Sequence, residues 1–386
     1  DKGSTRESRV KYAVIFIPFP VKGLISDEGE TDPDFNLYNP IESISDNDRL
    51  TYKKQFNAQF AFSWEILDGL KLKSEVGFND NKSDESRFFG LTTYYVKNNT
   101  SIKEQPAVSF VQKDKEGLRS TNTLNLDINK LFVDSEDHTV NVLLGHEYFV
   151  THSKSQSSIT DGLPVFFTSE NAFNMPALGS AMSIERTNSP DDVLVSWFAR
   201  ANYDYQSKYL LSATFRADGS SKFGEGNRWG FFPSAALAWR ISSESFMENT
   251  NSWLDDMKVR VSFGTAGNNN IPADQINRVY SAKTTTWING LDSYMAPSNK
   301  MTNKDLSWET TITRNLGLDF TMLNSKLSGS FEAYYNSTRD LLIDFPTQGT
   351  GYDSQYRNMG ETENKGFELS INYNPINRPN GSLTIS

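Results

Sequence analysis

The chain has 386 residues, with 48 acidic and 38 basic side chains and a net charge of -10. Without a cluster of lysine or arginine, this charge balance excludes nucleic acid as a first hypothesis. The chain contains no cysteine and three histidines, which removes disulfide scaffolds, thiolate metal sites and cysteine nucleophiles. The mean hydropathy is -0.55, and the longest apolar run, at 12–21, is too short for a transmembrane helix and contains two prolines.

The first clear element in chain order begins at Phe56, where apolar and polar residues alternate. One row is apolar and contains Phe56, Ala58, Phe60, Phe62, Trp64 and Ile66, and the intervening row is mostly polar. This period of two predicts a strand with one apolar and one polar face. The pattern recurs at 70–78, 121–133, 139–150, 192–205, 208–218, 230–241, 257–265, 306–320, 326–337 and 364–374. A less regular run before it, at 9–17, predicts one more strand.

The length of these runs and of the links between them indicates a membrane barrel. Strands of soluble proteins average about five to six residues, whereas a tilted strand needs about ten to cross a bilayer. Short links are expected at 67–69, 134–138, 206–207, 321–325 and 375–381, with a stretched one at 242–256. They alternate with longer links at 79–120, 151–191, 219–229, 266–305 and 338–363. We therefore predict an all-β fold, an antiparallel transmembrane β-barrel with short periplasmic turns and long extracellular loops.

The two faces of the predicted strands fit this barrel. Aromatic residues gather near the short turns, as expected of an interfacial girdle: Trp64, Tyr203, Tyr205, Tyr209, Trp239, Trp253, Phe320 and Tyr373. In the run at 306–320, Leu306, Trp308 and Leu318 are assigned to the apolar row, which Arg314 interrupts. The opposite rows would line a wet lumen with Arg200, Asp204, Arg216, Glu309 and Glu332.

Residues 1–386 are predicted to be one unit, because composition does not shift along the chain. The alternation still runs at 382–386, and a bilayer tolerates no open sheet edge, so the closing C-terminal strands are expected outside this chain. Two alternatives remain open. The first is a soluble all-β carbohydrate-binding or adhesion protein whose apolar rows form a core, and the second is a passive porin.

Patterns that carry catalysis or bind cofactors are absent, so the chain is predicted not to be an enzyme and to need no cofactor. Acidic residues are densest at 27–34, where oxygen ligands suit calcium, but a solvated acidic surface is the better interpretation. The scattered His138, His146 and His152 do not make a zinc site, and no metal is predicted.

Aromatic residues in the long loops are the better binding candidates. Rings with polar neighbours suit sugars or peptides through stacking and hydrogen bonds, although for any single ring the packing of the loops against one another is the better explanation. The candidate substrate contacts are Phe223, Trp229, Trp287, Tyr294, Tyr352 and Tyr356. Arg216 and Arg240, on polar rows near the loop at 218–228, are expected to pair with lumen carboxylates rather than to contact ligand.

Several strings resemble those of one family. RADGSSKFGEGNRWGFFPSAALAWRIS at 216–242 is similar to the signature segment of the SusC/RagA-type TonB-linked outer-membrane transporters of Bacteroidetes. Four further stretches support it in the same order, namely MKVRVSFGTAGNNNI from Met257, NKDLSWETTITRNLGLDF from Asn303, YNSTRDLL from Tyr335 and NMGETENKGFELSI from Asn358. A looser likeness extends back through 69–78 and 36–41, so the resemblance covers nearly the whole chain.

The resemblance implies a plugged barrel of about twenty-two strands, within the range known for outer-membrane transporters, in the outer membrane of a Gram-negative bacterium of the Bacteroidetes. It implies TonB-dependent import of a glycan or an oligopeptide together with a SusD-like surface lipoprotein. Neither a TonB box nor a plug domain is visible in 1–386, so contact with TonB is expected through a plug outside this segment. These residues would supply barrel wall, lumen and extracellular loops, with lipid on the outside.

Overall fold

The computed structural model describes residues 46–97, 104–132, 135, 137–278, 280–284, 293–378 and 381–385. Three sequence-based predictions lie outside these residues, namely the strand at 9–17, the acidic segment at 27–34 and Trp287. The chain divides into two compact units. The first contains 1–57, 79–116 and 153–189, and the second contains 58–78, 117–152 and 190–386.

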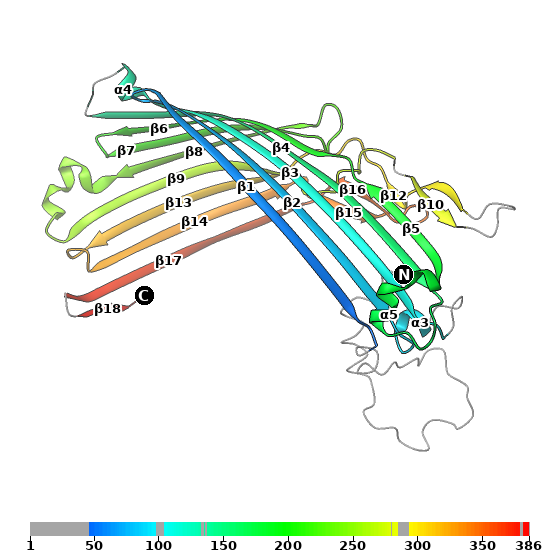
Figure 1. Ribbon diagram of the computed structural model, residues 1–386. Coiled ribbons are helices and arrows are strands. Elements are labelled where there is room, and N and C mark those ends of the chain that lie inside the picture. Colours follow the sequence, from blue (N-terminus) through cyan, green and yellow to red (C-terminus); the bar gives the residue numbers. More distant parts are fainter. Residues whose placement is uncertain are drawn as a thin grey trace. The chain divides into compact units, whose positions relative to one another are not determined.

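One 13-stranded sheet dominates the fold (Figure 1). Its strands pair in the order β1-β2-β3-β4-β6-β7-β8-β9-β13-β14-β17-β18, with β5 on β4. From β4 to β18, neighbouring strands of this order pair antiparallel, so each strand pairs with the strand that follows it across a hairpin or loop. The bounds are β1 Arg49–Leu67, β2 Leu70–Phe89, β3 Ala107–Asp127, β4 His138–Asp161, β5 Ser180–Asn188, β6 Asp192–Tyr205, β7 Tyr209–Ser220, β8 Trp229–Arg240, β9 Leu254–Asn268, β13 Glu309–Met322, β14 Leu327–Arg339, β17 Glu361–Arg378 and β18 Gly381–Ile385.

The alternation of short and long links is confirmed, but two predicted loops are largely strand. The predicted loop at 79–120 contains the outer halves of β2 and β3, and the one at 151–191 contains the end of β4 and all of β5. Residues 79–87 of β2 are polar on both faces. The period of two therefore disappears from the sequence there, although backbone pairing between strands continues.

Short elements fill the remaining links. Two small sheets lie in the long links, one made of β10 (Tyr280–Thr284) and β11 (Ser293–Pro297), the other of β12 (Lys300–Met301), β16 (Ser354–Asn358) and β15 (Leu342–Pro346). The helical segments are α3 Tyr94–Lys97, α4 Ile128–Phe132, α5 Ser169–Asn174, η2 Pro176–Leu178, η3 Ile241–Ser243 and η4 Ser245–Thr250. The stretched short link at 242–256 thus holds two 3-10 helices rather than an open turn.

No helix among the described residues combines the length and apolar character needed to span a membrane.

The apolar rows of the sheet in the second unit are exposed, not covered by protein. Side chains on these rows keep much of their surface accessible: Phe60 74%, Trp197 57% and Phe367 78%. The opposite rows of the same strands are mostly polar and carry charged side chains such as Arg200 and Glu368. A row of large apolar groups this long is not stable against water, so this face requires an apolar partner.

Leu306 and Trp308 were expected on the exposed apolar row, and this prediction is wrong. Strand β13 begins only at Glu309, and both side chains are buried in the link before it. Leu318, within the strand, is half-buried on the predicted row. The error arises because apolar residues spaced by two also occur where a loop folds back on itself.

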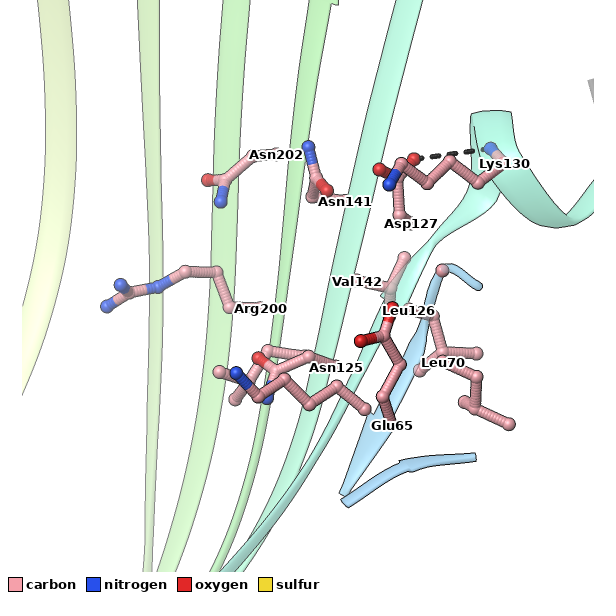
Figure 2. A pocket seen from close by; sticks show the side chains of 13 residues that line it. Glu65, Leu70, Asn125, Leu126, Asp127, Lys130, Asn141, Val142, Arg200 and Asn202 are labelled. Atoms are coloured by element: carbon pink, nitrogen blue, oxygen red, sulfur yellow. Dashed lines mark hydrogen bonds between the residues drawn. The ribbon is translucent and has the colours of Figure 1, made fainter. Parts of the chain in front are cut away.

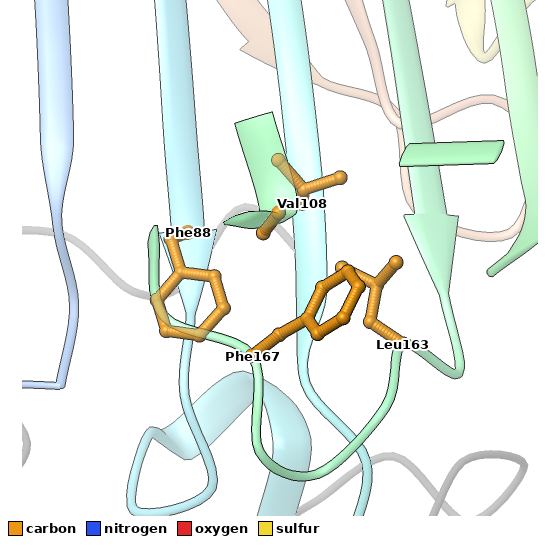
Figure 3. Packing of buried hydrophobic residues seen from close by; sticks show 5 residues of the cluster. Phe88, Val108, Leu163 and Phe167 are labelled. Carbon is orange, nitrogen blue, oxygen red and sulfur yellow. The ribbon is translucent and has the colours of Figure 1, made fainter. Parts of the chain in front are cut away.

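The first unit has its own small core (Figure 3). Phe88 and Val108, from neighbouring strands β2 and β3, pack with Leu163, Phe167 and Ala172 from the link that follows β4. Thr168 is the N-cap of helix α5, and its side-chain oxygen accepts a hydrogen bond from the backbone N–H of Asn171. This core fixes the ends of β2, β3 and β4 in a region where the sheet carries no apolar stripe.

Candidate functional site

A charged network occupies the polar face of β3, β4, β6 and β7. Glu147 on β4 is its centre: Oε2 accepts hydrogen bonds from Nε and NH2 of Arg119 at 2.9 and 2.6 Å, and Oε1 accepts from NH2 of Arg216 at 3.5 Å. Arg216 also donates from Nε to Oδ1 of Asp218 at 2.7 Å and from NH2 to Oγ of Ser196 at 2.8 Å. Two cations and two carboxylates therefore neutralise one another.

Burial explains why this network is fully paired. Glu147 is 5% exposed and Asp218 7% exposed, and an unpaired charge at that burial would be strongly destabilising. The guanidinium of Arg216 also lies over the ring of Phe198, 5.4 Å from its centroid. The expected pairing of Arg216 with lumen carboxylates is confirmed, and Arg240 pairs likewise with Asp256 at 3.4 Å. The sequence does not predict the pairing of Arg119 with Glu147, because the register of β3 against β4 brings these side chains together and the alternation pattern does not determine that register.

A second network lies on β9, β13 and β14. Arg260 donates from Nε and NH2 to the two carboxylate oxygens of Asp319, each at 2.8 Å, and from NH2 to Glu332 at 2.8 Å. Lys258 adds an ion pair with Asp319 at 3.3 Å. The predicted placement of Glu332 on the polar row is confirmed. These side chains crosslink three adjacent strands and leave their polar face close to neutral.

A hollow of about 310 Å³ lies on the polar face near the short links between β1 and β2 and between β3 and β4 (Figure 2). Its polar lining includes Arg200, the amides of Asn125, Asn141 and Asn202, and the charged side chains of Glu65, Lys71, Asp127 and Lys130. Asn141 and Asn202 also line an adjoining hollow of about 550 Å³ with small side chains such as Ala236, Ala238 and Ser262. The polar face thus offers open, hydrogen-bonding space.

An apolar cluster holds the loops at the opposite strand ends. Phe223, Phe232, Ile271, Leu306 and Trp308 are buried against one another, with Tyr356 packed at their side. The indole Nε1 of Trp308 donates to the backbone carbonyl of Arg228 at 2.9 Å. Residues 221–228, 269–278, 293–308 and 340–360 are therefore packed into one assembly.

The predicted substrate contacts fall into different surroundings. Phe223 is fully buried, with its ring 5.4 Å from that of Trp308, and acts as a packing residue in this arrangement. Trp229 is 47% exposed on the apolar row of β8 with Phe231, which places it where an interfacial ring would lie. Tyr352 and Tyr356 are half-buried in the link that carries β15 and β16. Tyr294 belongs to β11, and Trp287 lies outside the described residues.

The aromatic belt near the short links is present as predicted. Tyr205, Tyr209 and Trp239 stack in sequence across β6, β7 and β8, with ring centroids 6.2 and 6.5 Å apart. Below them, Glu244 in the link after β8 accepts hydrogen bonds from the hydroxyl of Tyr209 at 2.6 Å and from Nε1 of Trp239 at 3.0 Å. These hydrogen bonds, first that of Tyr209, lower the pKa of Glu244.

The three histidines lie apart: His138 and His146 contact aromatic rings, and Nδ1 of His152 lies 2.6 Å from Oδ1 of Asp191. His146 lies against Trp197 on the apolar face, with ring centroids 4.4 Å apart, and His138 lies beside Tyr203 and Tyr205. Among the residues that the structure describes, no group of three or more His, Asp or Glu side chains is placed to hold a metal ion.

An exposed apolar face, an aromatic belt and a paired polar face on a long antiparallel sheet together define the wall of an outer-membrane β-barrel. The family model "TonB dependent receptor-like, beta-barrel" matches residues 8–385. The chain belongs to this family and is located in the outer membrane.

Relatives and solved structures agree with this assignment. The chain is 32% identical to TonB-dependent receptor P3 of Formosa agariphila over 86% of this chain and 31% of that protein. It is 40% identical to TonB-dependent receptor SusC of Bacteroides thetaiotaomicron over 48% of this chain and 19% of that protein. A structure titled "Structure of the RagAB peptide transporter" shares the fold, with a TM-score of 0.74 and 23% identity over 88% of this chain and 36% of that one. The chain thus spans about a third of the length of P3.

Proposed function

We propose that the full-length protein imports a nutrient, a glycan or an oligopeptide, across the outer membrane in a TonB-dependent manner. The observation that carries this proposal is the combination of an exposed apolar face with a polar face whose buried charges are neutralised by pairing. Such a wall separates lipid from a wet interior. The proposal keeps both substrate classes, glycans and oligopeptides, because SusC and the RagAB peptide transporter are both similar to this chain.

Within that function, residues 1–386 supply part of the barrel domain, with the plug and the remaining strands in the rest of the full-length protein. We assign contact with TonB to that plug and propose a SusD-like lipoprotein as the partner at the long loops. The packed assembly of 221–228, 269–278, 293–308 and 340–360 supports this, because preformed loops lose little entropy when a partner binds.

Tyr352 and Tyr356, with Trp287 and Tyr294, remain the proposed substrate contacts in the long loops. Tyr356 is positioned by the assembly, since its backbone carbonyl accepts a hydrogen bond from Nδ2 of Asn303 at 2.9 Å. For Phe223 and Trp229 we propose supporting roles, in loop packing and at the outer membrane interface respectively. A ring held by its neighbours can stack on a sugar or a peptide side chain at low entropic cost.

The test is uptake by cells that express the full-length protein. Fluorescently labelled oligosaccharides and oligopeptides are supplied with and without a protonophore. Import of one class that stops when the proton gradient is collapsed supports the proposal. Import that continues after collapse identifies a passive porin instead, and a full-length protein that is monodisperse without detergent identifies a soluble protein.

A further inference from the structure

Among the side chains that the structure describes, the polar rows of β3, β6, β7, β8 and β9 carry five arginines, and four of them have a carboxylate partner. Arg119, Arg216, Arg240 and Arg260 each lie within 4.0 Å of an Asp or Glu oxygen. The fifth, Arg200 on β6, forms no ion pair with any described residue. Its Nε donates to Oγ1 of Thr214 at 3.2 Å, which orients the side chain while its terminal nitrogens stay available.

The surroundings of Arg200 are rich in unused donors. Asn141 and Asn202 face each other across β4 and β6. Oδ1 of Asn202 accepts a hydrogen bond from Ser212 at 2.8 Å, so its NH2 group points to open space without a partner among the described residues. Lys71 lines the same hollow and is exposed without an ion pair in the described part of the chain.

The carboxylates of the hollow are not positioned to use Arg200. Figure 2 shows the guanidinium extending away from Glu65 and Asp127, which stand on the other side of the hollow. Lys130 on that side already pairs with Asp68 at 3.0 Å. One end of the hollow therefore presents a guanidinium and amide N–H groups with no acceptor opposite them.

We propose that Arg200 is an anion subsite of the transport path, which binds a carboxylate of the imported cargo. A planar guanidinium matches a carboxylate through two parallel hydrogen bonds, and neighbouring amides satisfy the remaining acceptor lone pairs. The adjoining hollow of about 550 Å³, lined by small side chains such as Ala236 and by larger ones such as Leu210, gives room for the rest of the molecule. This inference rests on the proposed import function and narrows the cargo to acidic glycans or acidic peptides.

The test uses detergent-solubilised full-length protein and two matched pairs of probes. One pair is tetragalacturonate and its methyl ester, and the other is the N-acetylated, C-amidated peptide Ala-Ala-Glu-Ala and its Gln counterpart, so that the Glu side chain is the only carboxylate in the peptide pair. Calorimetry should show that the wild type binds the acid member of one pair about ten-fold more tightly, as expected for hydrogen bonds to a charged group. The pair that shows the preference identifies the cargo class.

Arg200→Gln should abolish this preference while binding of the neutral probe changes less than about two-fold, a change worth well under 1 kcal/mol. Arg200→Lys should retain part of the preference, because the charge remains without the bidentate geometry. Arg186→Gln is the matched control, since Arg186 is an exposed arginine on β5 without an ion pair among the described residues. It should behave as the wild type.

Equal binding of acid and neutral probes in both pairs overturns the proposal, as does a preference that survives Arg200→Gln. A lower unfolding temperature of Arg200→Gln without cargo also overturns it, because Arg200 would then pair with a carboxylate elsewhere in the full-length protein. Gradient-driven uptake without acid preference would leave import standing and remove this subsite. Acid preference without gradient-driven uptake would support the anion subsite and contradict the proposed TonB-dependent import.

Discussion

Arg216 and Asp218 lie two residues apart on the polar row of β7, and Nε of the arginine donates to Oδ1 of the aspartate at 2.7 Å. The same guanidinium reaches Glu147 on β4, two strands away in the sheet. A short stretch of the RADGSS string thus links adjacent strands through one cation. The structural role of this string is to hold the wall together.

Glu147→Gln should destabilise the barrel by about 1 to 3 kcal/mol, because two arginines lose a charged acceptor. Equilibrium unfolding of the full-length protein in urea measures this. Glu85→Gln is the control, since Glu85 pairs with Arg49 at the surface, with side chains 23% and 59% exposed. That change should cost under about 1 kcal/mol, and equal effects of both variants would contradict the central position of Glu147.

Gly145→Ala should destabilise the same region by about 1 to 3 kcal/mol through overpacking. A Cβ at Gly145 would overlap the ring of Phe198, which lies beneath the guanidinium of Arg216. The double variant Gly145→Ala, Phe198→Leu should recover part of the loss in the same urea measurement. No recovery would show that Phe198 is not the obstacle.

Trp308→Ala should loosen the outer loop assembly at a cost of about 3 to 5 kcal/mol. Amide hydrogen exchange should then rise in 221–228 and 269–278, and hardly change in β6 and β7. Trp308→Phe retains the ring but loses the hydrogen bond to the carbonyl of Arg228, so it should cost only about 1 kcal/mol. Unchanged exchange in Trp308→Ala would contradict the packing role.

Glu244 should make stability depend on pH in the acid range. Its pKa is lowered in the folded protein by hydrogen bonds from Tyr209 and Trp239, so its contribution is fully present above the unfolded pKa, about 4.3. The contribution is lost as pH falls from that value through the folded pKa. Between pH 6 and pH 3, the unfolding temperature of Glu244→Gln should fall less steeply than that of the wild type. Parallel curves for the two proteins would show that Glu244 does not cause the pH dependence.

The sequence predicts the fold best where the sheet meets lipid. The run at 192–205 coincides with β6, and those at 208–218 and 230–241 differ from β7 and β8 by at most two residues at either end, because one row there must be apolar. The outer halves of β2 and β3 were assigned to a loop, since residues 79–87 are polar on both faces and carry no period of two. Backbone pairing and the small core around Phe88 and Val108 hold those strand ends.

The sequence predicts which face of its strand a site residue lies on, but not which residue of a neighbouring strand it contacts. Arg216 lies on a polar row of known phase, so its pairing with a carboxylate could be expected. The partnership of Arg119 and Glu147 depends on the register of β3 against β4, which the alternation does not determine. The isolation of Arg200 is visible only after every other arginine on that face has been assigned a partner.

The most direct test of the lipid-facing wall uses single cysteines on β7, because the chain contains no cysteine of its own. Leu211 and Ser212 are adjacent and belong to opposite rows. The spin labels are placed in the full-length protein in liposomes. The label at Leu211→Cys should be relaxed more by oxygen, which concentrates in lipid. The label at Ser212→Cys should be relaxed more by a water-soluble nickel complex. Equal access of the nickel complex to both labels would contradict the wall.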